Sequence, residues 1–106
     1  MLQITVFQLE SGRFDEFLKR TSRAKKIRER AGAKVRYYRT VAGGLPAIAA
    51  VAETGGWKAY GEYMAKLESD PEWQKLIAEV RTDRDPSAKI VELRMSEEIE
   101  VSRRSG

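Results

Sequence analysis

Charged and phenolic side chains in segments that alternate like strands are the residues of this sequence best suited to chemistry. Ile90, Glu92 and Arg94 share one face of an alternating segment near the C-terminus, and Tyr38 lies in an aromatic stretch of the second predicted strand. An arginine with a tyrosine could orient an anionic or enolic ligand, and Glu92 would then be the only nearby base. The alternative is a cross-strand ion pair between an arginine and Glu92, and such pairs are commoner than catalytic dyads.

Aromatic and small polar residues on neighbouring elements could complete such a pocket. Thr5 and Phe7 of the first predicted strand would lie beside the ligand, and Trp57 and Tyr60 of a predicted helix could form an aromatic wall. Aromatic residues at helical spacing more often pack in the core, and Trp73 after Pro71 is interpreted as such an anchor. No catalytic residue is assigned, and the candidate ligand-binding residues are Thr5, Phe7, Tyr38, Trp57, Tyr60, Glu92 and Arg94.

The composition excludes several kinds of site. Cysteine and histidine are both absent from the 106 residues. Their absence removes the usual zinc sites, histidine-ligated haem, and Ser-His-Asp or Cys-His catalysis, so we expect no metal and no cofactor. The chain has no long apolar run and no signal-peptide pattern, which predicts a cytoplasmic protein that does not enter a membrane.

Positive charge is concentrated in one segment. The net charge is +4, and residues 19–39 contain ten basic residues but only one acidic residue, Glu29. Such a segment could bind phosphate groups, but a solvated outer face of a helix explains it more simply. No aromatic stacking platform or phosphate-binding glycine loop accompanies it, so we do not expect nucleic-acid binding.

Hydrophobic periodicity predicts seven elements in the order β-α-β-β-α-β, the last helix being made of two segments. Ser11 is predicted to cap the first helix and Gly32 to end it. A capping box of Ser69 and Glu72 is predicted to start the last helical segment, and Gly43-Gly44 to join a hairpin. The expected strands cover about 2–9, 33–42, 47–53 and 89–95, with helices between them and a turn at 83–87.

This order is the ferredoxin-like α+β pattern, with an antiparallel four-stranded sheet and both helices on one face. The third strand has an unusual composition. Ile48, Ala50 and Ala52 point to one face and Ala47, Ala49 and Val51 to the other. The second apolar face needs a cover, and a second copy of the sheet would close an eight-stranded α+β barrel.

The chain resembles the dimeric α+β barrel superfamily, in particular its NIPSNAP-like and antibiotic-biosynthesis-monooxygenase-like group. The resemblance lies in Gly43-Gly44-Leu45-Pro46 and in GGWKAYGEYMAKLESDPEWQKLIAEV, residues 55–80. It implies a homodimer with a cavity in each subunit. The superfamily includes cofactor-independent monooxygenases, isomerases, polyketide cyclases and haem-degrading enzymes, and the lack of histidine disfavours the haem-degrading branch.

The sequence therefore predicts one domain over residues 1–100 and a mobile tail over 101–106. We expect a homodimer that binds a small, partly apolar or aromatic molecule, and the resemblance implies cofactor-independent monooxygenase-like or isomerase-like activity. The alternative is a non-enzymatic structural or regulatory homodimer whose barrel is filled by its own side chains. A third hypothesis, anion or nucleic-acid binding by the first helix, is the weakest.

Overall fold

The computed structural model describes residues 1–9, 13–43, 47–83 and 88–101. It confirms the predicted order of elements, with the last helix split into two segments. In chain order they are β1 (Leu2–Leu9), α1 (Phe14–Arg30), β2 (Lys34–Arg39), β3 (Ala47–Glu53), α2 (Trp57–Glu68), α3 (Pro71–Thr82) and β4 (Ala88–Ser96).

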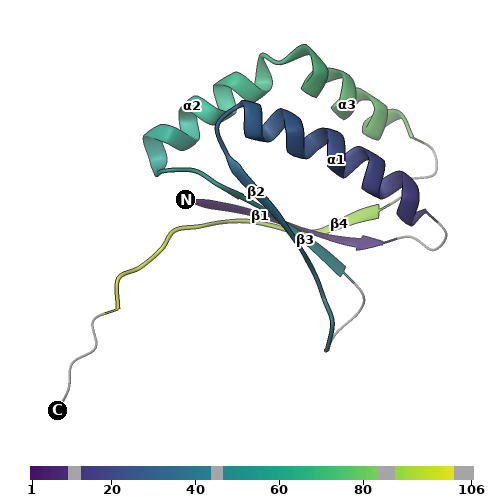
Figure 1. The fold of residues 1–106 in the computed structure, drawn as a ribbon, viewed down its shortest axis with the longest axis horizontal. Coiled ribbons are helices and arrows are strands. Elements are labelled where there is room, and N and C mark those ends of the chain that lie inside the picture. The colour runs from purple at the N-terminus through teal and green to yellow at the C-terminus, as the bar shows by residue number, and fades with distance from the viewer. Residues whose placement is uncertain (10–12, 44–46, 84–87, 102–106) are drawn as a thin grey trace.

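The four strands form one antiparallel sheet in the order β2-β3-β1-β4. The three helices lie together on one side of this sheet, and the other side carries no helix (Figure 1). This is the ferredoxin-like arrangement that the sequence predicted. The face opposite the helices is called the open face below.

The register of the strands decides which residues meet the helices. Thr5 of β1 is paired with Ala50 of β3, which is paired with Tyr37 of β2, and these three face the helices. Burial alternates along β3, where Ile48, Ala50 and Ala52 are buried. The intervening residues face the open side, as the alternation in the sequence predicted.

The core lies between the helices and β2 and β3. Ala52 is 1% exposed and contacts a cluster of buried side chains from α1, α2 and α3. A methyl side chain at this position allows the helices to approach the sheet closely, which explains the alanines on the inner face of β3. The remaining buried members of the cluster are Ile27, Ala31, Ala33, Val35, Tyr63, Leu67 and Leu76.

The junction between α2 and α3 is capped one residue later than predicted. Asp70, not Ser69, is the N-cap of α3, and its carboxylate accepts a hydrogen bond from the Glu72 N–H at 2.9 Å. Pro71 occupies the first helical position, where its fixed φ suits the helix, so the cap falls on the residue before it. Asp70 also accepts a hydrogen bond from Arg30 of α1 at 2.7 Å, which joins the two helices.

The predicted cap of α1 is not the one observed. The N-cap is Arg13, which makes no side-chain capping bond, and Ser11 lies outside the described residues. At the other end, Gly32 has a φ of +113°, in the region that favours glycine, so the predicted helix end is confirmed. Gly43 has a φ of +77°. Gly44 of the predicted hairpin turn, residues 84–87 of the predicted turn at 83–87 and residues 102–106 of the predicted tail at 101–106 lie outside the described residues.

Strand β4 departs from strict alternation. Its register with β1 shifts between Val6 and Phe7, where a β-bulge leaves Val91 unpaired in the register. As a consequence Ile90 and Leu93, three residues apart, both face the helix side. Strict alternation over residues 89–95 predicts Ile90 on the same face as Glu92 and Arg94, and this prediction is wrong because the bulge reverses the alternation.

Candidate functional site

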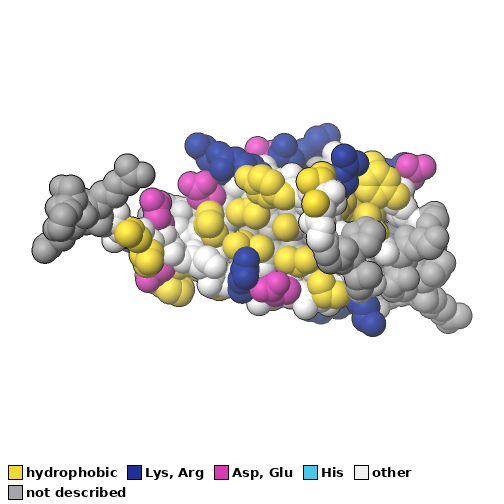
Figure 2. Space-filling view, turned by 90° about the horizontal axis from the view of Figure 1, so that it is seen from below, with side chains coloured by type: hydrophobic (Ala, Val, Ile, Leu, Met, Phe, Trp, Pro, Cys, Tyr) yellow, Lys and Arg dark blue, Asp and Glu magenta, His cyan; other side chains and the backbone are white. Residues whose placement is uncertain are grey.

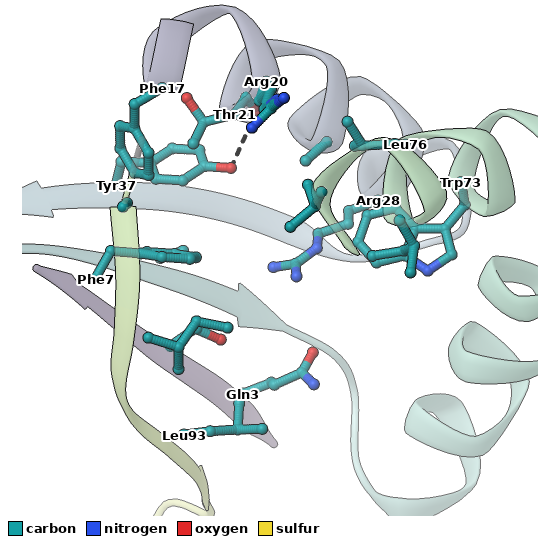
Figure 3. Close-up of a pocket in the computed structure, with 17 residues that line it drawn as sticks. Gln3, Phe7, Phe17, Arg20, Thr21, Arg28, Tyr37, Trp73, Leu76 and Leu93 are labelled. Atoms are coloured by element: carbon teal, nitrogen blue, oxygen red, sulfur yellow. Dashed lines mark hydrogen bonds between the residues drawn. The ribbon is translucent and has the colours of Figure 1, made fainter. Parts of the chain in front are cut away.

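A cavity of about 290 Å³ lies on the helix side of the sheet. It is bounded by β1 and β4 below and by α1 and α3 above (Figure 3). Its walls are mostly apolar, and Phe7 and Phe17 meet edge to face in one of them, with ring centroids 5.3 Å apart. This volume is close to the lower limit of about 300 Å³ for small-molecule pockets.

Arg28 of α1 is the most informative polar group of this cavity. Its guanidinium lies over the ring of Trp73 of α3, 5.2 Å from the ring centroid. The Nε atom is buried without a hydrogen-bond partner, and no described carboxylate forms an ion pair with this arginine. A cation that is partly desolvated and stacked on an indole can bind an anion with little reorganisation.

Gln3 of β1 extends into the cavity from the opposite layer (Figure 3). Its Oε1 atom is buried and has no hydrogen-bond partner among the described residues. Thr5, two residues further along the same face, is 4% exposed and also lines the cavity. Buried polar groups normally find partners, so the unpaired Gln3 oxygen indicates a place where a ligand group can bind.

Tyr37 of β2 is held in place by its hydroxyl, which donates a hydrogen bond to the Thr21 carbonyl at 3.2 Å (Figure 3). Burial raises the pKa of Tyr37, and nearby Arg28 offsets part of that rise. The phenol therefore stays protonated at neutral pH and acts as a donor. It is a positioning group for the cavity wall rather than a base.

Arg20 also lines the cavity, but carboxylates already hold it. Its guanidinium lies 2.7 Å from Asp83 and 3.2 Å from Glu16. Asp83 follows α3, so this ion pair links the start of α1 to the end of α3. Arg20 therefore closes the rim of the cavity and offers less to a ligand than Arg28 does.

The predicted site residues are divided between the two faces of the sheet. Thr5 and Phe7 line the cavity. Glu92 is paired in register with Val6 and Arg94 with Ile4, so both lie on the open face. The structure therefore does not bring Glu92 to the ligand expected beside Thr5, and Glu92 instead contacts Arg94 of the same strand at 3.1 Å.

Tyr38, Trp57 and Tyr60 also lie away from the cavity. Tyr38 borders a hollow of about 490 Å³ on the open face, together with Leu2, Val51 and others. Trp57, at the start of α2, is 65% exposed and touches Tyr60 edge to face. Tyr60 packs against the core cluster, as aromatic residues at helical spacing commonly do.

Sequence reasoning missed Arg28, Gln3 and Tyr37 as site residues. A signal for Arg28 was present, because Phe17, Thr21, Ala24 and Arg28 follow one another at helical steps of four and three. Arg28 thus occupies a position on the inward stripe of α1 where an apolar residue is expected. A cation in such a stripe is a candidate for a binding position.

The lining of the cavity limits what it can do. Among the residues that line it there is no aspartate or glutamate, so the described part of the chain supplies no carboxylate base there. Its two arginines, amide and phenol can bind and orient a polar group or stabilise negative charge. In the described residues no three acidic side chains gather as metal ligands would, and no helix is long and apolar enough to cross a membrane.

The basic segment of the sequence has a structural explanation in the described residues. Acidic side chains of α3 and its flanks contact the arginines of α1: Arg23 lies 2.6 Å from Glu79, and Arg30 lies 2.7 Å from Asp70. The pKa values of Glu79 and Asp70 are lowered, in each case chiefly by the hydrogen bond from the arginine. Much of the charge of α1 thus serves to join the helices.

The fold and the cavity define a class: an α+β sheet with helices on one face, with a mostly apolar cavity between the two layers. No protein-family model and no curated protein matches this sequence. Solved structures with the same fold are found, and their names agree with the resemblance stated above. They establish that this chain has the fold of NIPSNAP domain proteins.

Three of these structures cover most of the chain. An uncharacterised NIPSNAP domain protein from Burkholderia xenovorans has 15% identity and a TM-score of 0.65, over 95% of this chain and 98% of the other. An Agrobacterium tumefaciens protein has 19% identity and a TM-score of 0.62, over 86% and 90%. A NIPSNAP family protein from Agrobacterium tumefaciens has 18% identity and a TM-score of 0.60, over 88% and 78%.

Proposed function

We propose that this protein is a homodimer that binds a small, partly apolar or aromatic molecule in the cavity between its sheet and its helices. The observation that carries the proposal is the inverted polarity of β1. Gln3 and Thr5 face the helix layer, where the interior of the subunit should be apolar. Leu2, Ile4 and Val6 face away from the helices, where a lone subunit meets water.

The open face supports the dimer. Seen from the side opposite the helices, hydrophobic side chains gather across the middle of the sheet (Figure 2). Besides the apolar residues of β1, this face carries Ala47, Ala49 and Val51 of β3. A second copy that packs against this face through a two-fold axis would remove the apolar surface of both subunits from water.

Strand β4 adds to the need for a partner. It lies at the edge of the sheet, and Ile90, Val91 and Leu93 are 60%, 53% and 62% exposed. Long apolar edge strands invite pairing with other chains unless they are covered. Ile90 and Leu93 point to the helix side, so a partner would have to cover the edge of β4 as well as the open face.

Binding is a better explanation of the cavity than a proton-abstracting conversion. Its polar groups are two arginines, an amide and hydroxyls, and the described lining contains no carboxylate. Glu92, the base considered for a monooxygenase-like or isomerase-like reaction, lies on the other face of the sheet. The non-enzymatic alternative, with a barrel filled by its own side chains, predicts that no small molecule enters this cavity.

A fluorescence titration tests the cavity. Trp73 lines it and Trp57 is exposed, so the Trp57→Phe variant leaves a single tryptophan as the reporter. We expect 4-phenylbutan-1-ol or 4-phenylbutanoate to change its emission saturably. Ala24→Phe fills the cavity from α1 and should abolish the change, whereas Ala65→Phe, on the exposed face of α2, should not. If neither compound binds, the ligand-binding part of the proposal is wrong.

Light scattering at micromolar concentration tests the dimer. We expect twice the 12.1 kDa mass of one chain. Ile4→Glu places a charge in the middle of the open face and should give monomers, whereas Lys26→Glu on the exposed face of α1 should leave the dimer intact. A parent protein that scatters as a single chain would refute the dimer without refuting ligand binding.

A further inference from the structure

The cavity contains a positive charge that the protein itself does not neutralise. Four arginines of the basic segment have carboxylate partners among the described residues: Arg20, Arg23, Arg30 and Arg36. Arg28 is different, because it points into an apolar cavity and makes no ion pair with a described carboxylate. A charge kept partly out of water without a counter-ion is costly, so a binding role is the simplest reason for it.

The surroundings of Arg28 define the shape of the group it would bind. Its guanidinium is fixed by stacking on Trp73, 5.2 Å from the ring centroid. A planar guanidinium held in this way presents parallel N–H donors that match the two oxygens of a carboxylate. From the opposite wall, Gln3 contributes an amide whose NH₂ group can donate to an anion, whereas its unpaired Oε1 atom is an acceptor and suits only a donor of the ligand.

The rest of the cavity is suited to an apolar body. Phe7 and Phe17 form an aromatic wall, and Leu76 and Ile77 of α3 also line the cavity. With about 290 Å³, the cavity holds a molecule smaller than a typical drug. The ligand should therefore have one polar end and one compact apolar end.

We propose that the ligand of this cavity is a small aromatic or aliphatic carboxylate, whose anionic group is bound by Arg28 and whose apolar part lies between the two phenylalanines and α3. This inference rests on the proposed ligand-binding function and adds the chemical class of the ligand. Arg28 is the residue that determines specificity. No described aspartate or glutamate lines the cavity, so no negatively charged side chain there would repel such an anion.

The test compares two probes with the same skeleton. At pH 7.5 and constant ionic strength, 4-phenylbutanoate carries a carboxylate where 4-phenylbutan-1-ol carries a neutral hydroxyl. We expect the Trp57→Phe parent to bind the carboxylate about tenfold or more tightly, as charge-assisted hydrogen bonds allow. Arg28→Gln should remove this preference and leave the affinity for the alcohol within about threefold of the parent value.

A matched variant controls for the loss of charge. Lys26→Gln removes one positive charge from the exposed face of the same helix and should preserve the preference for the carboxylate. Arg28→Lys keeps the charge but not the planar fork, and it should retain part of the preference. It also provides a second measurement if Arg28→Gln does not fold, as judged by circular dichroism.

The outcomes separate this inference from the proposed function. If the parent binds both probes equally, the cavity binds small molecules but the carboxylate inference is wrong. It is equally wrong if Lys26→Gln reduces the preference as much as Arg28→Gln does. If the parent binds neither probe, the proposed ligand binding itself fails and the inference fails with it.

Discussion

Tyr63 carries a buried hydroxyl whose removal should stabilise the protein. The residue is 2% exposed, and its oxygen has no hydrogen-bond partner among the described residues. Burial also raises its pKa, so the group remains a neutral phenol. A buried polar group without a partner costs about 1–3 kcal/mol. Tyr63→Phe keeps the ring in the core and removes that cost, so the free energy of unfolding should rise by about 1 kcal/mol.

Urea unfolding followed by circular dichroism measures this change. For a domain of this size, about 1 kcal/mol corresponds to a rise of about 4 °C in Tm. The m value of urea unfolding, which reports the surface exposed on unfolding, should not change. All variants must be compared at one protein concentration, because dimer formation would make stability depend on concentration.

Tyr37→Phe is the matched control. The Tyr37 hydroxyl donates to the Thr21 carbonyl at 3.2 Å, and a helix carbonyl also accepts a bond from its own helix. Its loss should lower stability by about 0.5 kcal/mol, at the low end for a hydrogen bond. If Tyr63→Phe lowers stability as Tyr37→Phe does, the Tyr63 hydroxyl has a partner and the reasoning about its burial is refuted.

Two further substitutions test the core and the junction of the helices. Leu76→Ala should lower the free energy of unfolding by about 2–5 kcal/mol, because Leu76 is 3% exposed in the core cluster. If urea unfolding shows a decrease of less than about 1 kcal/mol, that packing is contradicted. Asp70→Asn keeps a capping side chain but loses the charge that pairs with Arg30. Since the pKa of Asp70 is lowered in the fold, its contribution is complete above the ordinary aspartate pKa near 4 and is lost below it. The difference in free energy of unfolding between wild type and Asp70→Asn should therefore be largest at pH 7 and decrease towards pH 3. A difference that does not change with pH would contradict the ion pair.

The architecture could be predicted because the sequence patterns of its elements are strong and local. Alternation along β3 predicted Ile48, Ala50 and Ala52 on one face, and all three are buried together. Helix boundaries were less certain. The Ser69 cap was wrong by one residue, since the position of Pro71 decides the cap and several capping residues compete nearby.

The site was harder to predict because it depends on which face of each strand meets the helices. Strict alternation in β4 placed Glu92 with Ile90, but the bulge opposite Val6 and Phe7 separates them. A bulge is a tertiary feature with no distinct signature in this sequence. Thr5 and Phe7 were placed together correctly, since neighbouring odd positions of one regular strand always share a face.

Strand β1 connects the two proposals through one physical argument. A chain that folded only for the stability of a single subunit would turn Leu2, Ile4 and Val6 towards the helices and expose Gln3 and Thr5. A shift of one residue would achieve this, yet the observed register pairs Ile4 with Val51 and Thr5 with Ala50. The observed register gains stability only if something covers the open face and a ligand group meets the polar side chains of Gln3 and Thr5 in the cavity. Proteins depart from the pattern of apolar residues inside and polar residues outside mainly at functional sites. In β1 both the helix side and the open side depart from this pattern. The Ile4→Glu and Arg28→Gln experiments examine the two sides separately, so either can fail while the other holds.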